Sequence, residues 1–303
     1  MALKQIKSKI KATERTSKVT KAMEAVSAVK MRKSQERAFQ GRPFAESALR
    51  ILENVSRSAE VRQHTFVQEN LGSHHCFIVI TSDKGLAGSL NSAVLKEASG
   101  AIQNTAQENV EIICFGKKAY EHFLRRGYTI PKHYLQISDE IAMRDVEEVV
   151  ALITARYSAG LYKSVSVVYQ HFASTFEQKA TTRQVLPISQ EAVRAMIHDI
   201  LPKQGKFSEI EKVQSPVVYN TEQSSELLYD AMFSMLVEIM VYHALLESKA
   251  SEHSARMVAM KNATDKAKEV TKALTLLYNK KRQSVITAEV SEITGGIEAL
   301  KNA

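Results

Sequence analysis

Cysteine is scarce in this chain of 303 residues, which contains only Cys76 and Cys114. Both lie in apolar runs, a setting typical of buried, reduced thiols, so we expect a reducing, cytosol-like compartment. The residues after Met1 lack the apolar stretch of a secretory signal. The sequence also has no run of about 18 apolar residues, which argues against a transmembrane helix.

Glycine and proline are both absent from residues 217–294, and Gly295 follows this stretch. Its apolar residues alternate at spacings of four and three, the heptad seam of a supercoiled helix. These residues are Leu228, Met232, Met235, Ile239, Tyr242 and Leu246, and then Ile286, Val290, Ile293, Ile297 and Leu300. This stretch predicts a helix about 110 Å long, with a capping box from Asn220 to Gln223 and a stop signal at Gly295. Because the heptad spacing resumes beyond this glycine, we assign residues 220–300 to the C-terminal helix. Since a mean globular helix has about 12 residues, this length indicates a mechanical or scaffolding use.

The middle of this predicted helix has small or polar residues on its seam, which weaken a permanent coiled-coil core. They are Ala250, His253, Met257, Met260, Thr264, Ala267 and Thr271. Two interpretations stay open. The segment forms a thin, closely approaching helix pair, or it contacts a surrounding sleeve at few points and moves within it.

The N-terminal residues 1–58 predict a second helix, with a kink at Pro43. Several positions of its seam are small and polar, which suits close approach to another helix. The seam runs through Leu3, Ile6, Ile10, Thr13, Ser17 and Thr20, and the later turns carry Met23, Val26 and Met31. Residues 1–37 hold eleven Lys or Arg against three Glu, an excess equal to the net charge of +8 of the whole chain. Such a block indicates an acidic partner or a solvated helix face.

Nucleic acid is the less favoured acidic partner. Residues 1–38 contain no aromatic side chain that could stack on bases. The charges recur all round the predicted helix instead of forming one stripe. We therefore predict no nucleic-acid binding.

The middle of the chain, residues 75–187, predicts an α/β domain with parallel central strands. Strands are expected at 77–81, 111–116, 132–138 and 164–172, with an antiparallel edge strand at 181–186 that Pro187 closes. Helices are expected at 90–103, 118–126 and 142–157. Residues 188–216 are a polar connection, part helical around 192–200. The predicted fold class is therefore α/β plus a long antiparallel coiled coil, in which N- and C-terminal helices flank an inserted Rossmann-like domain.

The sequence offers no active site. The turn from Ser82 to Ser89 is rich in glycine, as phosphate-binding turns are. However, it lacks the lysine of a P-loop and the three-glycine spacing of a dinucleotide fingerprint. The histidines, among them His74 and His75, show no metal-ligand spacing, and no G-x-S-x-G elbow is present. We expect no catalytic residue, no cofactor and no metal, and we interpret the turn as tight backbone geometry.

Four separated motifs resemble one known family, the gamma subunits of F-type ATP synthases. The C-terminal motifs are Glu252–Asp265, EHSARMVAMKNATD, and Leu277–Ile293, LYNKKRQSVITAEVSEI. The others are Ser82–Gly88, SDKGLAG, together with IKSKI, TKAME and KMRK in residues 6–33. At Lys84 and Ala87 the family often has Arg and Cys. The resemblance covers the whole chain in collinear order, and residues 188–216 match least.

This resemblance implies a non-catalytic rotor shaft. In the family, the two terminal helices form an antiparallel coiled coil inside a ring of alpha and beta subunits. The α/β domain meets the epsilon subunit and the membrane ring of c subunits. Proton flow turns this ring and shaft, and rotation drives ATP synthesis on the beta subunits. The basic N-terminal helix is then expected to face acidic loops of the beta subunits.

The resemblance also assigns subunit contacts. Met23 is expected near the acidic lever loop of the beta subunits. Arg256, Gln283, Thr287 and Glu289 are expected in gamma–beta contacts or their linked polar network. A lysine at position 23 is expected to add an ion pair to the beta loop and to lower ATP synthesis more than ATP hydrolysis.

The chain lacks the cysteine-bearing regulatory loop of chloroplast members and a transit peptide. These departures favour a bacterial subunit, peripheral on the cytoplasmic side of the inner membrane, without thiol switching. Two other classes stay open: a coiled-coil adaptor with an α/β head, and a nucleotide-dependent enzyme built on residues 75–187.

Overall fold

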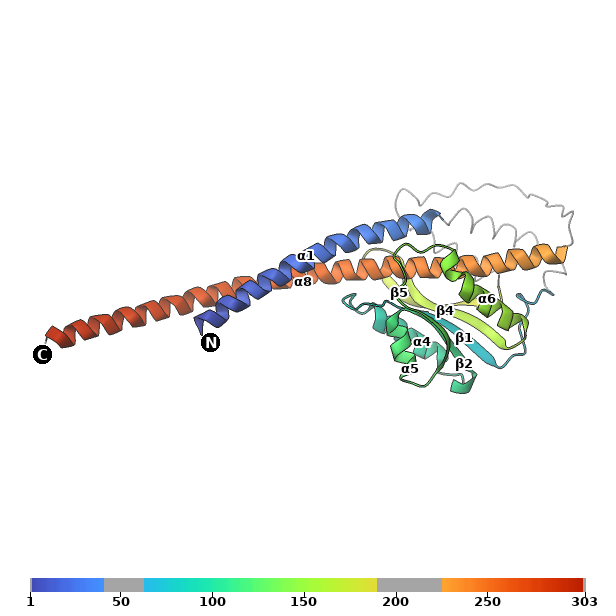
Figure 1. Cartoon of the computed structure of the whole chain (residues 1–303), viewed down its shortest axis with the longest axis horizontal. Helices are drawn as coiled ribbons and strands as arrows, with labels where there is room; N and C mark the ends of the chain where they lie inside the picture. The colour runs from blue at the N-terminus through green and yellow to red at the C-terminus, as the bar shows by residue number, and fades with distance from the viewer. Residues whose placement is uncertain (1, 41–62, 190–224, 302–303) are drawn as a thin grey trace. The chain divides into compact units, whose positions relative to one another are not determined.

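The computed structural model describes residues 2–40, 63–189 and 225–301 (Figure 1). The chain divides into two compact units. The helical unit consists of Met1–Val26 with Met257–Ala303, and the sheet unit consists of Ser27–Arg256. Helices α1 (Leu3–Gln40) and α8 (Ser225–Lys301) each contribute residues to both units.

The sheet unit is built on a five-stranded mixed sheet with the order β3-β2-β1-β4-β5. The strands are β1 (His74–Ile80), β2 (Val110–Phe115), β3 (Thr129–Tyr134), β4 (Tyr162–Phe172) and β5 (Gln178–Leu186). The pairs β1–β2, β1–β4 and β2–β3 are parallel, and β5 is an antiparallel edge strand beside β4. The predicted α/β class, its parallel central strands and its antiparallel edge are confirmed.

Helices cover both faces of this sheet, because the buried central strands are apolar on either side. On one face α4 (Leu90–Ile102) and α5 (Lys117–Leu124) pack through Val94, Ala98 and Phe123. On the other face α6 (Arg144–Ser158) and α8 share one apolar core with the sheet, in which Ile153 and Phe233 are fully buried (Figure 1). The sheet unit therefore has three layers.

Two predicted boundaries are wrong. The third strand is β3, Thr129–Tyr134, and not residues 132–138, because the chain turns at Gln136, where φ is 56°. Helix α8 does not stop at Gly295 but continues to Lys301. The predicted helix beyond Gln40, its kink at Pro43, the cap at Asn220 and the connection 188–216, apart from its first two residues, lie outside the described residues.

Within the sheet unit α8 is buried more widely than a heptad seam requires. Leu236, Val237, Met240 and Val241 are buried beside the predicted seam residues, whereas the seam residue Met235 is 43% exposed. One window of α8 within Tyr229–Ile297 has a mean hydropathy of 1.3 and is long and apolar enough to cross a membrane. However, 67% of this window is buried. Its apolar surface is used in packing, as in the core helix of a folded domain.

In the helical unit, α1 and α8 lie side by side and antiparallel (Figure 1). The predicted seam of α1 is confirmed from Leu3 to Thr20, where Leu3, Ile6, Ile10, Thr13, Ser17 and Thr20 are all buried or half-buried, but it is wrong at Val26, which is 55% exposed. The residues of α8 that are buried here are Met260, Thr264 and Ala267, all predicted seam positions. A seam with so few large side chains brings the two helices close together.

Candidate subunit-contact site

The seam of the helical unit is joined by a buried pair of hydroxyl groups. Thr20 Oγ1 and Thr264 Oγ1 lie 2.6 Å apart. Either hydroxyl could be the donor in this contact, because Thr264 Oγ1 also lies 2.8 Å from the Met260 carbonyl oxygen and Thr20 Oγ1 lies 3.1 Å from the Thr16 carbonyl oxygen. Each hydroxyl is therefore satisfied, which a buried polar group requires. The polar seam is a specific contact between α1 and α8.

The outer surface of α1 in this unit is basic. Its seven Lys and Arg residues are all exposed: Lys4, Lys7, Lys9, Lys11, Arg15, Lys18 and Lys21. Among the described residues, no ion pair joins these cations to an acidic group. A surface of this sign attracts an acidic partner and accelerates its association.

The C-terminal part of α8 carries an exposed apolar stripe. Ile286, Val290, Ile293 and Ile297 are 47%, 56%, 64% and 52% exposed. Their spacing of four, three and four residues continues the heptad pattern, so they lie on one face of the helix. Aligned apolar residues of this kind mark a surface that a partner covers.

The structure distributes the predicted contact residues over both units. Met23 is half-buried on the seam of the helical unit, and Gln283, Thr287 and Glu289 are exposed on α8. Thr287 Oγ1 donates to the Gln283 carbonyl at 3.0 Å, so these two residues lie on the same helix face. Arg256 belongs to the sheet unit and donates to Glu252 Oε1 at 2.7 Å.

A charged cluster around Asp139 was missed by sequence reasoning. Asp139 lies in the loop between β3 and α6, where it binds Lys30 of α1 at 2.6 Å and His253 of α8 at 3.0 Å. These partners are 109 and 114 residues away along the chain. The only sequence signal is an acidic pair, Asp139-Glu140, in a chain whose N-terminal helix is basic.

The glycine-rich turn after β1 is closed by the chain's own hydrogen bonds. At the amino end of α5, Thr81 Oγ1 accepts from the Ala119 amide at 2.8 Å and Asp83 Oδ1 accepts from the Lys117 amide at 3.0 Å. A Cβ on Gly116 would lie 2.2 Å from the Thr81 carbonyl oxygen. These two hydrogen bonds fix the start of the turn against the amino end of α5, which supports the interpretation as tight turn geometry.

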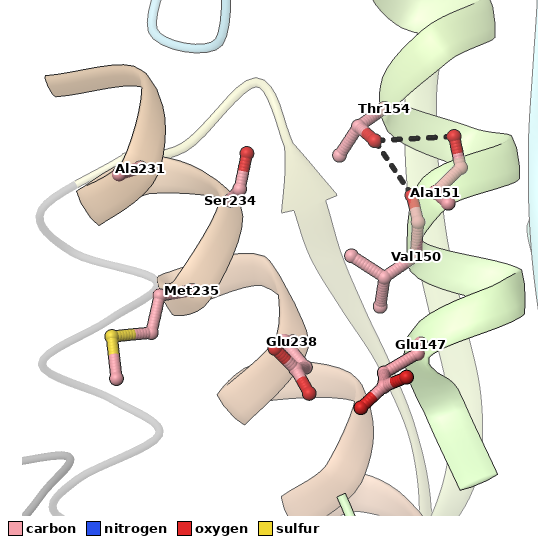
Figure 2. A pocket seen from close by; sticks show the side chains of 8 residues that line it. All are labelled: Glu147, Val150, Ala151, Thr154, Ala231, Ser234, Met235 and Glu238. Atoms are coloured by element: carbon pink, nitrogen blue, oxygen red, sulfur yellow. Dashed lines mark hydrogen bonds between the residues drawn. The ribbon is translucent and has the colours of Figure 1, made fainter. Parts of the chain in front are cut away.

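A groove of about 410 Å³ lies between α6 and α8 (Figure 2). The carboxylates of Glu147 and Glu238 face one another across it, and burial together with the charge of Glu147 raises the pKa of Glu238. The remaining lining residues are Val150, Ala151, Thr154, Ala231, Ser234 and Met235. The groove therefore presents an acidic surface between the two helices. Among the described residues, no group of His, Cys, Asp and Glu forms a metal site.

The fold and these surfaces define a class: a chain with a long helix pair and a three-layer α/β unit, whose exposed basic and apolar surfaces suit contacts with other chains. The family model for ATP synthase matches residues 2–300. The ATP synthase gamma chain of Cytophaga hutchinsonii is 36% identical over 307 residues, which cover 99% of each chain.

Solved structures show the same fold. The central stalk and c-ring structure of the Tetrahymena thermophila mitochondrial ATP synthase contains a chain with a TM-score of 0.58 and 23% identity, covering 81% of this chain and 99% of that one. A chain of the Euglena gracilis mitochondrial ATP synthase has a TM-score of 0.64 and 18% identity, covering 98% and 94%. This chain belongs to the gamma-chain family of the F-type ATP synthase, the non-catalytic subunits of the central stalk.

Proposed function

We propose that this chain is the shaft that couples rotation of a proton-driven c ring to ATP synthesis and hydrolysis in a head of alpha and beta subunits. The observation that supports this most directly is the pair of uncovered surfaces in the helical unit. These are the exposed cations of α1 and the exposed stripe Ile286, Val290, Ile293 and Ile297. A rotating shaft needs both surfaces. Its apolar end packs against the subunits that hold it, and its charged side attracts acidic loops of the surrounding subunits.

The proposed contacts with the beta subunits are made by Met23, Arg256, Gln283, Thr287 and Glu289. Support for the last three comes from their exposure on α8 next to the apolar stripe. Arg256 is different, because its guanidinium is already bound to Glu252 and its side chain is only 11% exposed. We propose that Glu252 orients the Arg256 guanidinium, and that Arg256 acts on a partner subunit through this polar network.

The sheet unit is proposed to meet the epsilon subunit and the c ring, which makes the chain peripheral to a membrane. We further propose the cytoplasmic side of a bacterial inner membrane. Both cysteines support a reducing compartment, since burial raises the pKa of the Cys76 and Cys114 thiols to about 12. Such thiols remain protonated and unreactive at neutral pH.

Affinity purification from native membranes tests the proposed function. A tagged chain should recover alpha, beta and epsilon subunits, and the c ring when a mild detergent is used. The variant Ile286→Ser, Val290→Ser, Ile293→Ser should lose most of the recovered head, because burying one such side chain stabilises a complex by about 1.5–3 kcal/mol. Glu292→Ser, on the same turns, is the matched control and should recover the full set.

Recovery of the tagged chain as a homodimer without these subunits would contradict the rotor function. That result would instead favour an adaptor protein with an α/β head.

A further inference from the structure

The loop between β3 and α6 is held by both long helices within the sheet unit. From α8, Lys249 Nζ donates to the Ile137 carbonyl at 3.3 Å, and Tyr242 Oη donates to the Ile141 carbonyl at 3.3 Å. From α1, Arg37 Nη1 donates to the Asp139 carbonyl at 3.3 Å. The backbone of this loop therefore accepts hydrogen bonds from two separate helices.

Asp139 is the side chain at which these two helices meet. One carboxylate oxygen accepts from Lys30 of α1 at 2.6 Å. The other is 3.0 Å from His253 Nε2 and 3.9 Å from Lys249 Nζ, both on α8. We call this set of residues, Lys30, Asp139, Lys249 and His253, the Asp139 cluster.

The cations of the cluster keep the Asp139 carboxylate ionised. Partial burial alone would raise the pKa of Asp139, but the hydrogen bond from Lys30 and the charges of His253 and Lys249 lower it below its ordinary value. Lys249 is also paired with Glu252 at 3.6 Å, and Glu252 in turn binds Arg256. The cluster is therefore continuous with the proposed contact residue Arg256.

We propose that Asp139 is a positioning residue of the rotor: it locks α1 and α8 to the α/β sheet, so that torque passes between the sheet and both helices without slip. This inference rests on the proposed function. It adds the place at which torque passes between the sheet and the two helices. A shared carboxylate suits this role because hydrogen bonds to a charged group are short, directional and stronger than neutral ones. Removing the charge leaves Lys30 without this counterion and leaves Lys249 with Glu252.

The test compares charge-removing with charge-retaining variants in the whole complex, reconstituted in vesicles. We expect Asp139→Asn and Lys30→Met to reduce protons pumped per ATP hydrolysed at least threefold, while the ATPase rate stays within twofold of wild type. Asp139→Glu and Lys30→Arg, which keep the charges, should retain most of the coupling. Glu140→Gln is the matched control: its carboxylate neighbours Asp139 but is exposed, and among the described residues its ion pair is with Arg37, at 3.3 Å.

Each outcome decides the question. Full coupling in Asp139→Asn and Lys30→Met would overturn the proposal, as would an equal loss in Glu140→Gln. If Asp139→Asn fails to assemble, Lys30→Met decides, because the Lys30 side chain is 45% exposed and its loss leaves the core intact. The proposed function fails separately, when the wild-type chain neither binds the head nor pumps protons.

Discussion

Replacing Thr20 or Thr264 by valine tests whether the small, polar seam holds α1 and α8 together through a specific contact. Valine has the same shape as threonine, so each change removes a hydroxyl and leaves no cavity. In Thr20→Val, the Thr264 hydroxyl still donates to the Met260 carbonyl. In Thr264→Val, the Thr20 hydroxyl can donate to the Thr16 carbonyl, 3.1 Å away. Neither variant leaves a buried donor without an acceptor.

The expected loss is therefore that of one net hydrogen bond, about 1 kcal/mol, and not the larger penalty of an unsatisfied group. The double variant should lose no more than either single variant, because replacing both partners by apolar groups is nearly neutral. The coupling energy of the double-mutant cycle should then be about 1 kcal/mol.

Hydrogen exchange of α1 amides in the full chain measures this locally, without assuming that the whole chain unfolds in one step. Each single variant should raise the exchange rate near Thr20 about fivefold, which corresponds to 1 kcal/mol. Thr13→Val is the control, since its hydroxyl donates only within α1, to the Lys9 carbonyl. Additive effects in the double variant would refute the contact across the seam. A loss above about 3 kcal/mol in either single variant would show that the remaining hydroxyl does not keep an acceptor.

Three further predictions follow. Gly116→Ala should destabilise the sheet unit by about 3 kcal/mol or more in thermal unfolding, because φ is 89° and the new Cβ would meet the Thr81 carbonyl. Gly100→Ala, which meets nothing within 4 Å in helix α4, should be neutral or slightly stabilising. Met23→Lys should lower ATP synthesis more than ATP hydrolysis in the complex; equal losses would count against the proposed coupling role. Acidification from pH 8 to 5 should raise the hydrogen-exchange rates of amides in the loop between β3 and α6, which His253 contacts through Asp139. The variant His253→Gln should abolish this pH dependence.

The surroundings of His253 disfavour its protonation in the folded chain. Burial lowers the pKa of His253, and the charges of Arg256 and Lys249 lower it further, whereas Glu252 and Asp139 raise it. The buried Nδ1 has no hydrogen-bond partner among the described residues, so a proton there is poorly accommodated. The unfolded chain then binds this proton more readily than the folded chain. The stabilisation is complete above the ordinary histidine pKa of about 6.5 and is lost as the pH falls below it.

Most of the fold was predictable because its elements are specified locally. The apolar runs that became β1 and β2 are bounded by turn residues, and the spacing on α1 marks the same residues that the structure buries. Strand β3 was misplaced because it contains Pro131, which an edge strand tolerates but which argues against a strand in sequence alone. Gly295 does not end α8, since a glycine within a helix costs only about 1 kcal/mol.

The Asp139 cluster could not be predicted for a different reason. Its members come from α1, the loop after β3 and α8, and only the folded sheet brings them together. Nothing in the local sequence of Lys30 or His253 distinguishes either residue from the other charged and polar residues of a long helix. The width of the buried face of α8 was also missed. A heptad pattern predicts contact with one partner helix, whereas this helix packs on the sheet as well.

Helix α8 thus combines three kinds of surface along one element, and their order has a consequence for function. From Phe233 to Leu246 it buries large apolar side chains against the sheet, each worth about 1.5–3 kcal/mol. From Lys249 to Arg256 it carries charged and polar contacts, and beyond Met257 its seam with α1 is small and polar. The apolar contacts hold α8 on the sheet, and the charged contacts add directional bonds to the loop after β3. The remainder of α8 has few large buried side chains and ends in an exposed apolar stripe, which is the surface that the proposed partner subunits would cover.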